Sequence, residues 1–165
     1  MTHLVTFAII ASLLMTGAIF GFFYAWVCSV MWGLDAADPR VAISAMQAVN
    51  ASIRNAVFAT AFFGTPVMLL VTAILVWARS RAGALAFGLA ALVYLGGGLI
   101  VTLAVNVPMN EALARVEVPQ SVTAAREIWE AYSGPWQAWN LARTVVSGTA
   151  LTLAAWGAIV VARLG

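Results

Sequence analysis

The amino-acid sequence predicts an all-α membrane protein: four transmembrane helices in an up-down bundle, with short extramembrane helices in the two long outer connections. Three observations lead to this fold class. Of the 165 residues, 64% are hydrophobic and only 8% are charged. Four segments each supply the roughly 20 apolar residues that cross a bilayer core. The connections between these segments are alternately long and very short, as in an antiparallel bundle.

The expected transmembrane helices cover about residues 4–34, 56–77, 82–105 and 144–162, and the expected outer helical connections are residues 35–55 and 106–143. The first apolar segment lacks a basic stretch before it and is far longer than the apolar core of a cleaved signal peptide. We therefore expect it to be retained, which makes residues 1–165 a single integral membrane domain.

The arginines predict the orientation in the membrane. Arg79, Arg81 and Arg163 stand without acids in the short connection and near the C-terminus, whereas the two long connections hold five arginines and all six acids. A plain count of arginines favours the long connections, but the positive-inside bias is strongest in short loops near the membrane. We therefore expect a multi-pass protein of the cell (inner) membrane with both termini in the cytoplasm.

The first long connection has a helix-start signal, with Asp38 as an N-cap and Pro39 at the first helical position. We expect this helix to begin outside the bilayer and to continue into the second transmembrane segment.

The second long connection contains three local signals. Pro108 predicts a break in the third segment, followed by a short helix. Ser121 is a candidate N-cap of another short helix, and Ser133 before Gly134 and Pro135 predicts that the fourth segment begins its own helix there.

Several kinds of chemistry lack their residues. His3 is the only histidine and Cys28 the only cysteine, and no HExxH, CxxC or GxSxG motif occurs. Haem, zinc and Ser-His-Asp sites are therefore excluded, and we expect no metal and no other cofactor. The carboxylates lack the spacing of a calcium loop and are interpreted as solvated surface. The basic residues are nearly balanced by acids, so no nucleic-acid partner is expected.

The aromatic residues toward the outer side allow two interpretations. They suit an interfacial aromatic belt, which we favour, or the wall of a binding pocket. The residues concerned are Tyr24, Trp26, Trp32, Trp129, Tyr132, Trp136 and Trp139.

Two polar stripes precede the second and fourth apolar segments. The first consists of Gln47, Asn50 and Arg54, and the second of Trp136, Trp139 or Asn140, and Arg143. Spacings of three and four residues place each stripe on one helix face, so the two faces are able to meet across the outer end of the bundle. The alternative is that both stripes are interfacial anchors.

Polar side chains at membrane depth are costly unless they are paired, and they often serve a function. Asn106 and Asn110 flank Pro108 at the exit of the third segment, and Asn140 and Arg143 share a face at the entry of the fourth. They either form a site or satisfy the carbonyls that Pro108 leaves free and cap the bundle. The sequence favours neither interpretation over the other.

Four blocks carry a family resemblance: "AMQAVNASIRNAVF" (45–58), "FFGTP" (62–66), "VTLAVNVPMNEALA" (101–114) and "PWQAWNLARTV" (135–145). In this order and spacing they resemble the anthrone oxygenase family. One departure is Trp32-Gly33, where related sequences often have Pro-Gly at the end of the first helix.

The resemblance implies a four-helix membrane protein that oxidises an anthrone- or hydroquinone-like lipophilic aromatic compound with O2 and without a metal or flavin. The motifs of the family fall on Met46, Gln47 and Asn50, on Asn106, Pro108 and Asn110, and on Trp139, Asn140 and Arg143.

We expect Arg143, Asn140 and Asn110 to stabilise an anion and Glu111 or Glu130 to act as the base. The expected substrate contacts are Trp136, Trp139, Asn106, Gln47, Asn50 and Arg54. The alternative is a non-enzymatic membrane protein that binds a lipophile or forms a structural subunit of a membrane complex. Besides the lipid bilayer and such an aromatic compound, a homo-oligomer remains open as a partner.

Overall fold

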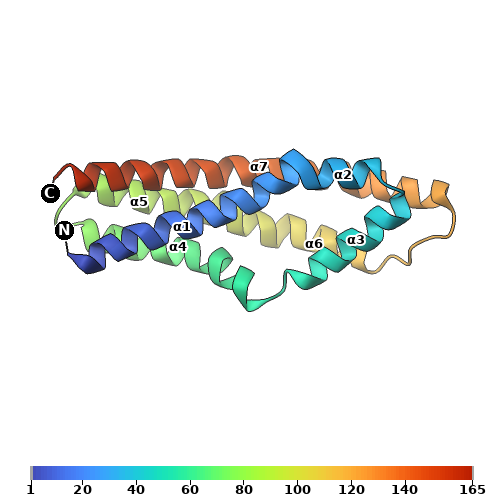
Figure 1. Ribbon diagram of the computed structural model, residues 1–165, viewed down its shortest axis with the longest axis horizontal. Coiled ribbons are helices and arrows are strands. Elements are labelled where there is room, and N and C mark those ends of the chain that lie inside the picture. The colour runs from blue at the N-terminus through green and yellow to red at the C-terminus, as the bar shows by residue number, and fades with distance from the viewer. Residues whose placement is uncertain (1, 165) are drawn as a thin grey trace.

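A computed structural model describes residues 2–164, and its elements in this range are all helices (Figure 1). Four of its helical stretches are long and apolar enough to cross a membrane, which makes the chain a multi-pass membrane protein. These stretches are His3–Ala36, Ala56–Val76, Arg81–Ala114 and Val122–Ala162. The predicted fold class is confirmed.

The four stretches consist of the following elements. The first contains α1 (His3–Ala25), the π-helical turn η1 (Trp26–Val30) and α2 (Met31–Ala36). A separate helix, α3 (Pro39–Ser52), precedes the second stretch, α4 (Ala56–Val76). The third contains α5 (Arg81–Val93), the π-helical turns η2 (Tyr94–Ile100) and η3 (Thr102–Asn106), and α6 (Val107–Ala114), and the fourth is the single helix α7 (Val122–Ala162).

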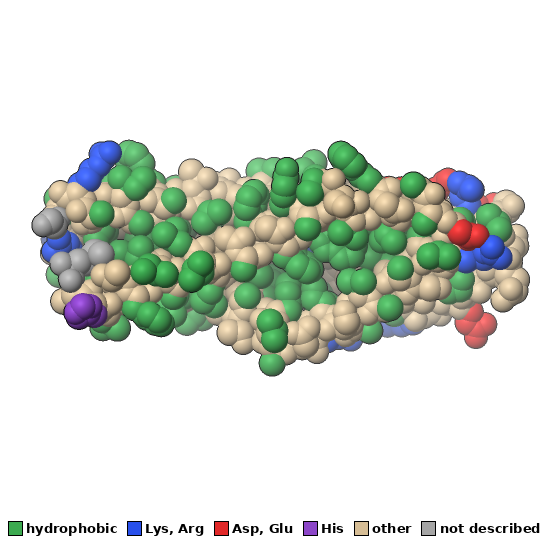
Figure 2. Space-filling view, viewed as in Figure 1, with side chains coloured by type: hydrophobic (Ala, Val, Ile, Leu, Met, Phe, Trp, Pro, Cys, Tyr) green, Lys and Arg blue, Asp and Glu red, His purple; other side chains and the backbone are tan. Residues whose placement is uncertain are grey.

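The helices run up and down, so that both chain ends lie at the same end of the bundle (Figure 1). At that end, α1 packs against α4 and α7, and α5 packs against the same two helices. The core there is apolar, with Phe23, Leu69, Phe87 and Tyr94 all buried. We call the opposite end, which holds α2, α3 and α6, the outer end. The acids visible in Figure 2 gather at the outer end.

The prediction that α3 continues into α4 is wrong. The helix ends at Ser52, and α4 begins after Asn55, whose side-chain oxygen accepts a hydrogen bond from the Phe58 amide at 3.0 Å. An Asn at this position satisfies one of the free amides at a helix start, so a second N-cap outweighs continuity. The resulting elbow between α3 and α4 bows away from α1 (Figure 1).

The break predicted at Pro108 does not occur. The third stretch continues through Pro108 to Ala114, although the expected short helix, α6, does follow. The π-helical turn η3 ends directly before α6. Its wider turns accommodate Pro108, which has no backbone N–H to donate to the preceding turn.

A separate helix start near Ser133 was also predicted, and this is wrong. Ser121 caps α7, as expected, but α7 then runs without interruption through Pro135. Asp35 on α2 connects the two sides of Pro135, because its carboxylate accepts hydrogen bonds from Ser133 before the proline and from Gln137 after the proline. Tertiary contacts therefore override the local helix-start signal.

Candidate functional site

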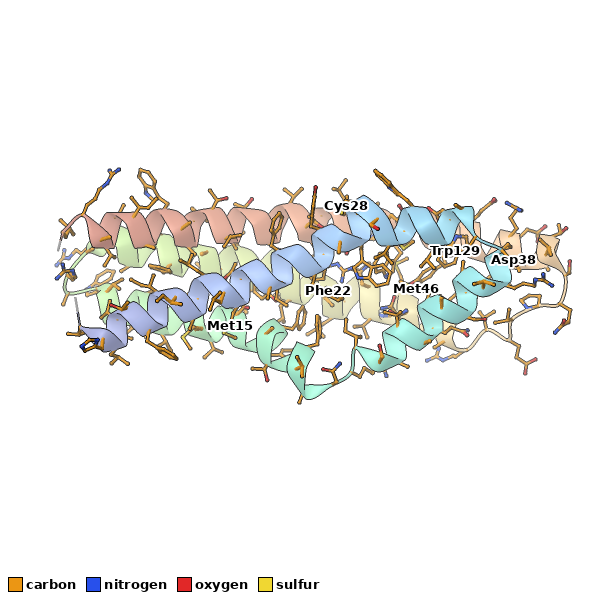
Figure 3. All side chains as sticks on the ribbon, viewed as in Figure 1. Met15, Phe22, Cys28, Asp38, Met46 and Trp129 are labelled. Atoms are coloured by element: carbon orange, nitrogen blue, oxygen red, sulfur yellow. The ribbon has the colours of Figure 1, made fainter. Side chains whose placement is uncertain are left out.

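The outer half of the bundle contains a partly open cavity of about 380 Å³ beneath the α3–α4 elbow. Phe22 lies on the side of α1 that faces this elbow (Figure 3), and its ring centroid is 5.1 Å from that of Phe58 on α4. All four spanning stretches and α3 contribute to the lining of the cavity, which includes Phe22, Phe23, Trp26, Asn50, Arg54, Phe58, Phe62, Thr102, Asn110, Trp136 and Arg143.

Most of the cavity wall is aromatic. Phe58 stacks on Phe62 with centroids 5.2 Å apart, and Trp26 meets Trp136 edge to face at 5.1 Å. Such walls suit a flat apolar ligand, because ring faces and edges gain both buried area and favourable quadrupole contacts.

Arg143 is the one charged side chain buried in this wall, and it is only 5% exposed. Its Nη2 donates to Asn140 Oδ1 at 3.0 Å and its Nη1 to Thr102 Oγ1 at 3.3 Å, while its Nε has no partner. The guanidinium carbon lies 4.5 Å from the ring centroid of Phe23 and 5.4 Å from that of Trp136. Two aromatic faces and two neutral oxygens therefore surround it.

No carboxylate among the described residues forms an ion pair with Arg143. A guanidinium keeps its proton in proteins, so the charge cannot be removed by titration. A buried charge without a counter-ion costs several kcal/mol in free energy, and such residues in membrane segments usually mark a functional site. The cavity is therefore prepared for a ligand that brings negative charge.

Asn140 holds the guanidinium in place. It is 1% exposed, and its Nδ2 donates to the backbone carbonyl of Phe23 at 3.1 Å. The carbonyl only accepts and the Arg143 guanidinium only donates, so the amide of Asn140 has one possible orientation. This side chain ties α7 to α1 and fixes the position of the charge.

Asn110 presents a donor to the cavity. Its Oδ1 accepts from Trp136 Nε1 at 2.9 Å and from the Tyr132 hydroxyl at 2.8 Å. An indole N–H only donates, so the Asn110 oxygen must face Trp136 and its Nδ2 must point the other way. Asn110 on α6 therefore contacts the polar stripe of α7 through Trp136.

Asn50 and Asn106 have unsatisfied amide groups. The Nδ2 of Asn50, which lines the cavity, has no hydrogen-bond partner, and neither amide atom of Asn106 has one. Asn106 is 1% exposed but does not line the cavity. Among the described residues, neither Asn106 nor Asn110 donates to a carbonyl freed by Pro108. The bonds of Asn110 to α7 and of Asn140 to α1 do hold helices together, as the alternative of a bundle cap expects.

The rim of the cavity contains an ion pair. Arg54 lines the cavity, and its Nη2 lies 3.5 Å from Glu111 Oε1, with both side chains largely exposed. Glu111 itself does not line the cavity. Gln47 also lies outside it, where its Nε2 donates to the carbonyls of Leu113 and Val116 at 2.9 Å each and so holds the end of α6.

Only some of the aromatic residues toward the outer side fit an interfacial aromatic belt. Trp26, Trp129, Tyr132 and Trp136 are buried, which corrects the belt interpretation for these four. Trp139 is 42% exposed and faces away from the cavity, so Asn140 and not Trp139 shares the face of Trp136 and Arg143.

Glu130, the other base considered from the sequence, lies at a separate polar depression with Asp35 and Arg126. Within the part of the chain that the structure describes, no group of three or more His, Cys, Asp or Glu side chains is arranged to hold a metal ion.

Sequence reasoning missed Thr102 and the phenylalanines of the cavity wall. Thr102 lies four and eight residues before Asn106 and Asn110, so the helical spacing contained a signal for it. The phenylalanines gave no such signal, because apolar side chains in a transmembrane helix face lipid, core and cavity alike.

Fold and site together define a class: a four-helix membrane protein whose outer half contains an aromatic cavity around a buried arginine. The model of the anthrone oxygenase family matches residues 55–153, which is more than half of the chain. The chain belongs to the anthrone oxygenase family. Comparisons with curated proteins and with solved structures give no match.

Proposed function

We propose that this protein oxidises a lipophilic, anthrone- or hydroquinone-like aromatic compound with O2 and uses no cofactor to do so. The observation that carries the proposal is the uncompensated guanidinium of Arg143 in the wall of an aromatic cavity. The cavity volume of about 380 Å³ falls within the range of small-molecule sites, roughly 300–1,000 Å³. Membership of the anthrone oxygenase family supports the same chemistry.

The reaction needs no metal or flavin, because the substrate supplies the electrons. An anthrone that loses a proton becomes an electron-rich enolate, and its ring carbon forms a bond to O2. The methylene carbon then loses its second hydrogen as the O–O bond breaks, which gives a carbonyl and water. One O2 is consumed for each anthrone. A hydroquinone would instead pass two electrons and two protons to O2 and give a quinone and hydrogen peroxide.

The cavity residues supply anion stabilisation and a dry environment. Arg143 and the Nδ2 of Asn110 are the donors to the substrate oxygen, and Asn140 positions Arg143. Trp136 offers a ring to the planar substrate. Glu111, paired with Arg54 at the rim, is the candidate acceptor of the substrate proton.

A second candidate is a non-enzymatic protein that holds a lipophile in the same cavity. It is favoured by one observation: among the described residues that line the cavity, none is a carboxylate or histidine able to act as a base. A structural subunit of a larger complex would use the fold in the same way, without turnover.

The test is O2 consumption by the full chain purified in mild detergent, with a panel of anthrones, hydroquinones and related phenols. We expect uptake with at least one compound, and one O2 for each anthrone oxidised. A folded protein that consumes no O2 with any of them refutes the oxygenase. A coloured preparation would refute the cofactor-free reaction.

Arg143→Lys separates the two candidates. Lysine keeps the charge but lacks the planar donor fork, so the developing anion is held less well. An oxygenase should lose turnover by roughly tenfold or more, while ligand affinity falls far less. A binding protein should show a small change in affinity only. Arg126→Lys, an exposed arginine on the same helix, is the matched control.

We propose that the termini face the cytoplasm, in the cell (inner) membrane, so that the cavity lies toward the outer surface. Arg79 in the short α4–α5 connection and Arg81 at the start of α5, both without nearby acids, support this orientation. In a Cys28→Ser background, an impermeant thiol reagent on intact cells should label Glu117→Cys and spare Ala82→Cys. The reverse pattern would invert the topology.

A further inference from the structure

Among the described residues, the polar side chains of the cavity wall have more unpaired donors than unpaired acceptors, and the one side-chain amide oxygen among them without a hydrogen bond is Asn50 Oδ1. Arg143 Nε and Asn50 Nδ2 lack partners, and Asn110 is oriented with Nδ2 away from its two bound donors. The Thr102 hydroxyl donates to the Gly98 carbonyl at 2.7 Å, so its hydrogen is already used. A ligand oxygen therefore meets N–H groups and the uncompensated charge of Arg143, while the second guanidinium of the lining, Arg54, is paired with Glu111 at the rim.

A neutral acid is a poorer match for such a wall than its anion is. The O–H of a phenol or an enol has to donate to an acceptor, and an unpaired buried donor costs about 1–3 kcal/mol. Among the described residues that line the cavity there is no carboxylate, imidazole or thiolate to take up the proton. The unpaired Asn50 Oδ1 can accept the O–H, but a neutral ligand held there leaves the charge of Arg143 uncompensated. The corresponding oxyanion only accepts, and it also neutralises Arg143.

We infer that the cavity binds its ligand as an oxyanion that is already formed, and that the proton is lost at the rim or in water and not inside the cavity. The ligand class is a flat, lipophilic phenol or enol that ionises near neutral pH. The inference rests on the proposed function for its substrate class, but binding of the anion does not require oxidation.

The steps balance without a base in the cavity. The acid gives its proton to water, directly or through Glu111 at the rim, and its anion enters. A carbon of this anion forms a bond with O2 and becomes a peroxide anion. Its C–H and O–O bonds then break, which yields a carbonyl group and hydroxide. Hydroxide combines with the proton released earlier, so the net products are the ketone and water.

A non-oxidisable dye tests binding apart from turnover. The probe is a hydroxyanthraquinone with one phenolic group, whose visible spectrum changes on ionisation, titrated with and without the purified full chain. We expect the bound dye to have a pKa lower than the free dye by about one unit or more, which is tenfold or more tighter binding of the anion. Its neutral methyl ether should bind at least tenfold more weakly.

Arg143→Gln should abolish the shift in the dye pKa, because glutamine donates without a charge. Arg126→Gln, which removes an exposed arginine from the same helix, should leave the shift intact. If Arg143→Gln does not fold, Arg143→Lys should keep part of the shift. A bound dye with an unchanged pKa, a dye bound as the neutral phenol, or no binding of the dye would each overturn the inference.

Turnover gives an independent check. Across anthrones with substituents of different electron demand, the midpoint of the pH–rate profile should move with the acidity of the substrate. A midpoint that stays fixed would indicate a protein base in the bound complex and overturn the inference. A protein that shifts the pKa of the dye but consumes no O2 would refute the proposed oxidation and leave the inference standing.

Discussion

Asp35 offers the sharpest test of how the outer end is held together. This carboxylate, near the end of α2, accepts hydrogen bonds from Trp129 Nε1 at 2.9 Å, Ser133 Oγ at 2.7 Å and Gln137 Nε2 at 2.9 Å. The donors lie on both sides of Pro135 in α7. We predict that Asp35→Ala destabilises the protein by about 2 kcal/mol, chiefly through the orphaned indole of Trp129.

The magnitude follows from what each donor does after the truncation. Trp129 is 4% exposed, and an unsatisfied buried N–H costs about 1–3 kcal/mol. The Ser133 hydroxyl can turn to a carbonyl of its own helix, so its loss is small. Gln137 is half-buried and reaches water. The three contributions to the loss in free energy of unfolding sum to about 2 kcal/mol. This is less than the loss expected if all three hydrogen bonds to the carboxylate left buried, unpaired donors.

The assay is the free energy of unfolding from denaturant titration in mixed micelles, followed by tryptophan fluorescence and far-UV circular dichroism. Asp35→Asn keeps an accepting oxygen and should lose about half as much as Asp35→Ala. The control is Glu127→Ala, an exposed residue on α7, expected to stay within about 0.5 kcal/mol of wild type. The carboxylate of Asp35 with its three donors is called the Asp35 clamp. If Asp35→Ala and Glu127→Ala unfold at the same denaturant concentration, the clamp contributes nothing to stability and the prediction is refuted.

Three further predictions concern single contacts. Trp136→Phe keeps a ring but removes the N–H that orients Asn110, so dye affinity should fall several-fold and stability by about 1 kcal/mol; unchanged affinity would show that Tyr132 suffices. Gln47→Leu removes two hydrogen bonds to the end of α6 and should lower the free energy of unfolding by about 1–2 kcal/mol, with Ser44→Ala as control. Arg40, through its side-chain and backbone hydrogen bonds, lowers the pKa of Asp38 from 3.8 to about 2. The resulting stability is present above pH 4 and is lost as pH falls toward 2, and Asp38→Asn should flatten this part of a melting-temperature profile.

Composition and hydropathy were enough to predict the number and order of the spanning helices, because the bilayer imposes length and apolarity directly. Local signals predicted the starts at Asp38 and Ser121, where water reaches the chain. They did not predict the path through Pro108 and Pro135. Tertiary contacts and wider turns decide these places, and neither is visible in a local pattern.

The site was predictable where polarity stood out against an apolar background. Arg143 and Asn140 share a face and contact each other as their spacing indicated, and Asn110 contacts Trp136 of the same stripe. Spacing did not predict that Gln47 holds the end of α6 or that Trp139 faces outward, since a stripe defines a face but not its neighbour. The roles of these residues in catalysis or binding remain predictions for the experiments above.

The helix break between α3 and α4 was not predicted, and the breaks predicted near Pro108 and Pro135 do not occur. All three results have the same physical origin. Within a bilayer, an interrupted helix exposes amides and carbonyls that lipid cannot satisfy. The chain therefore passes Pro108 behind the wider turns of η3, and it passes Pro135 beside the Asp35 clamp. Asn55 lies at the rim, where the Arg54 side chain is 64% exposed. It caps both helix ends, because its Oδ1 accepts from the Phe58 amide of α4 and its Nδ2 donates to the Ser52 carbonyl of α3. A break is tolerated there because its backbone groups find partners, and it produces the elbow that gives the cavity its width.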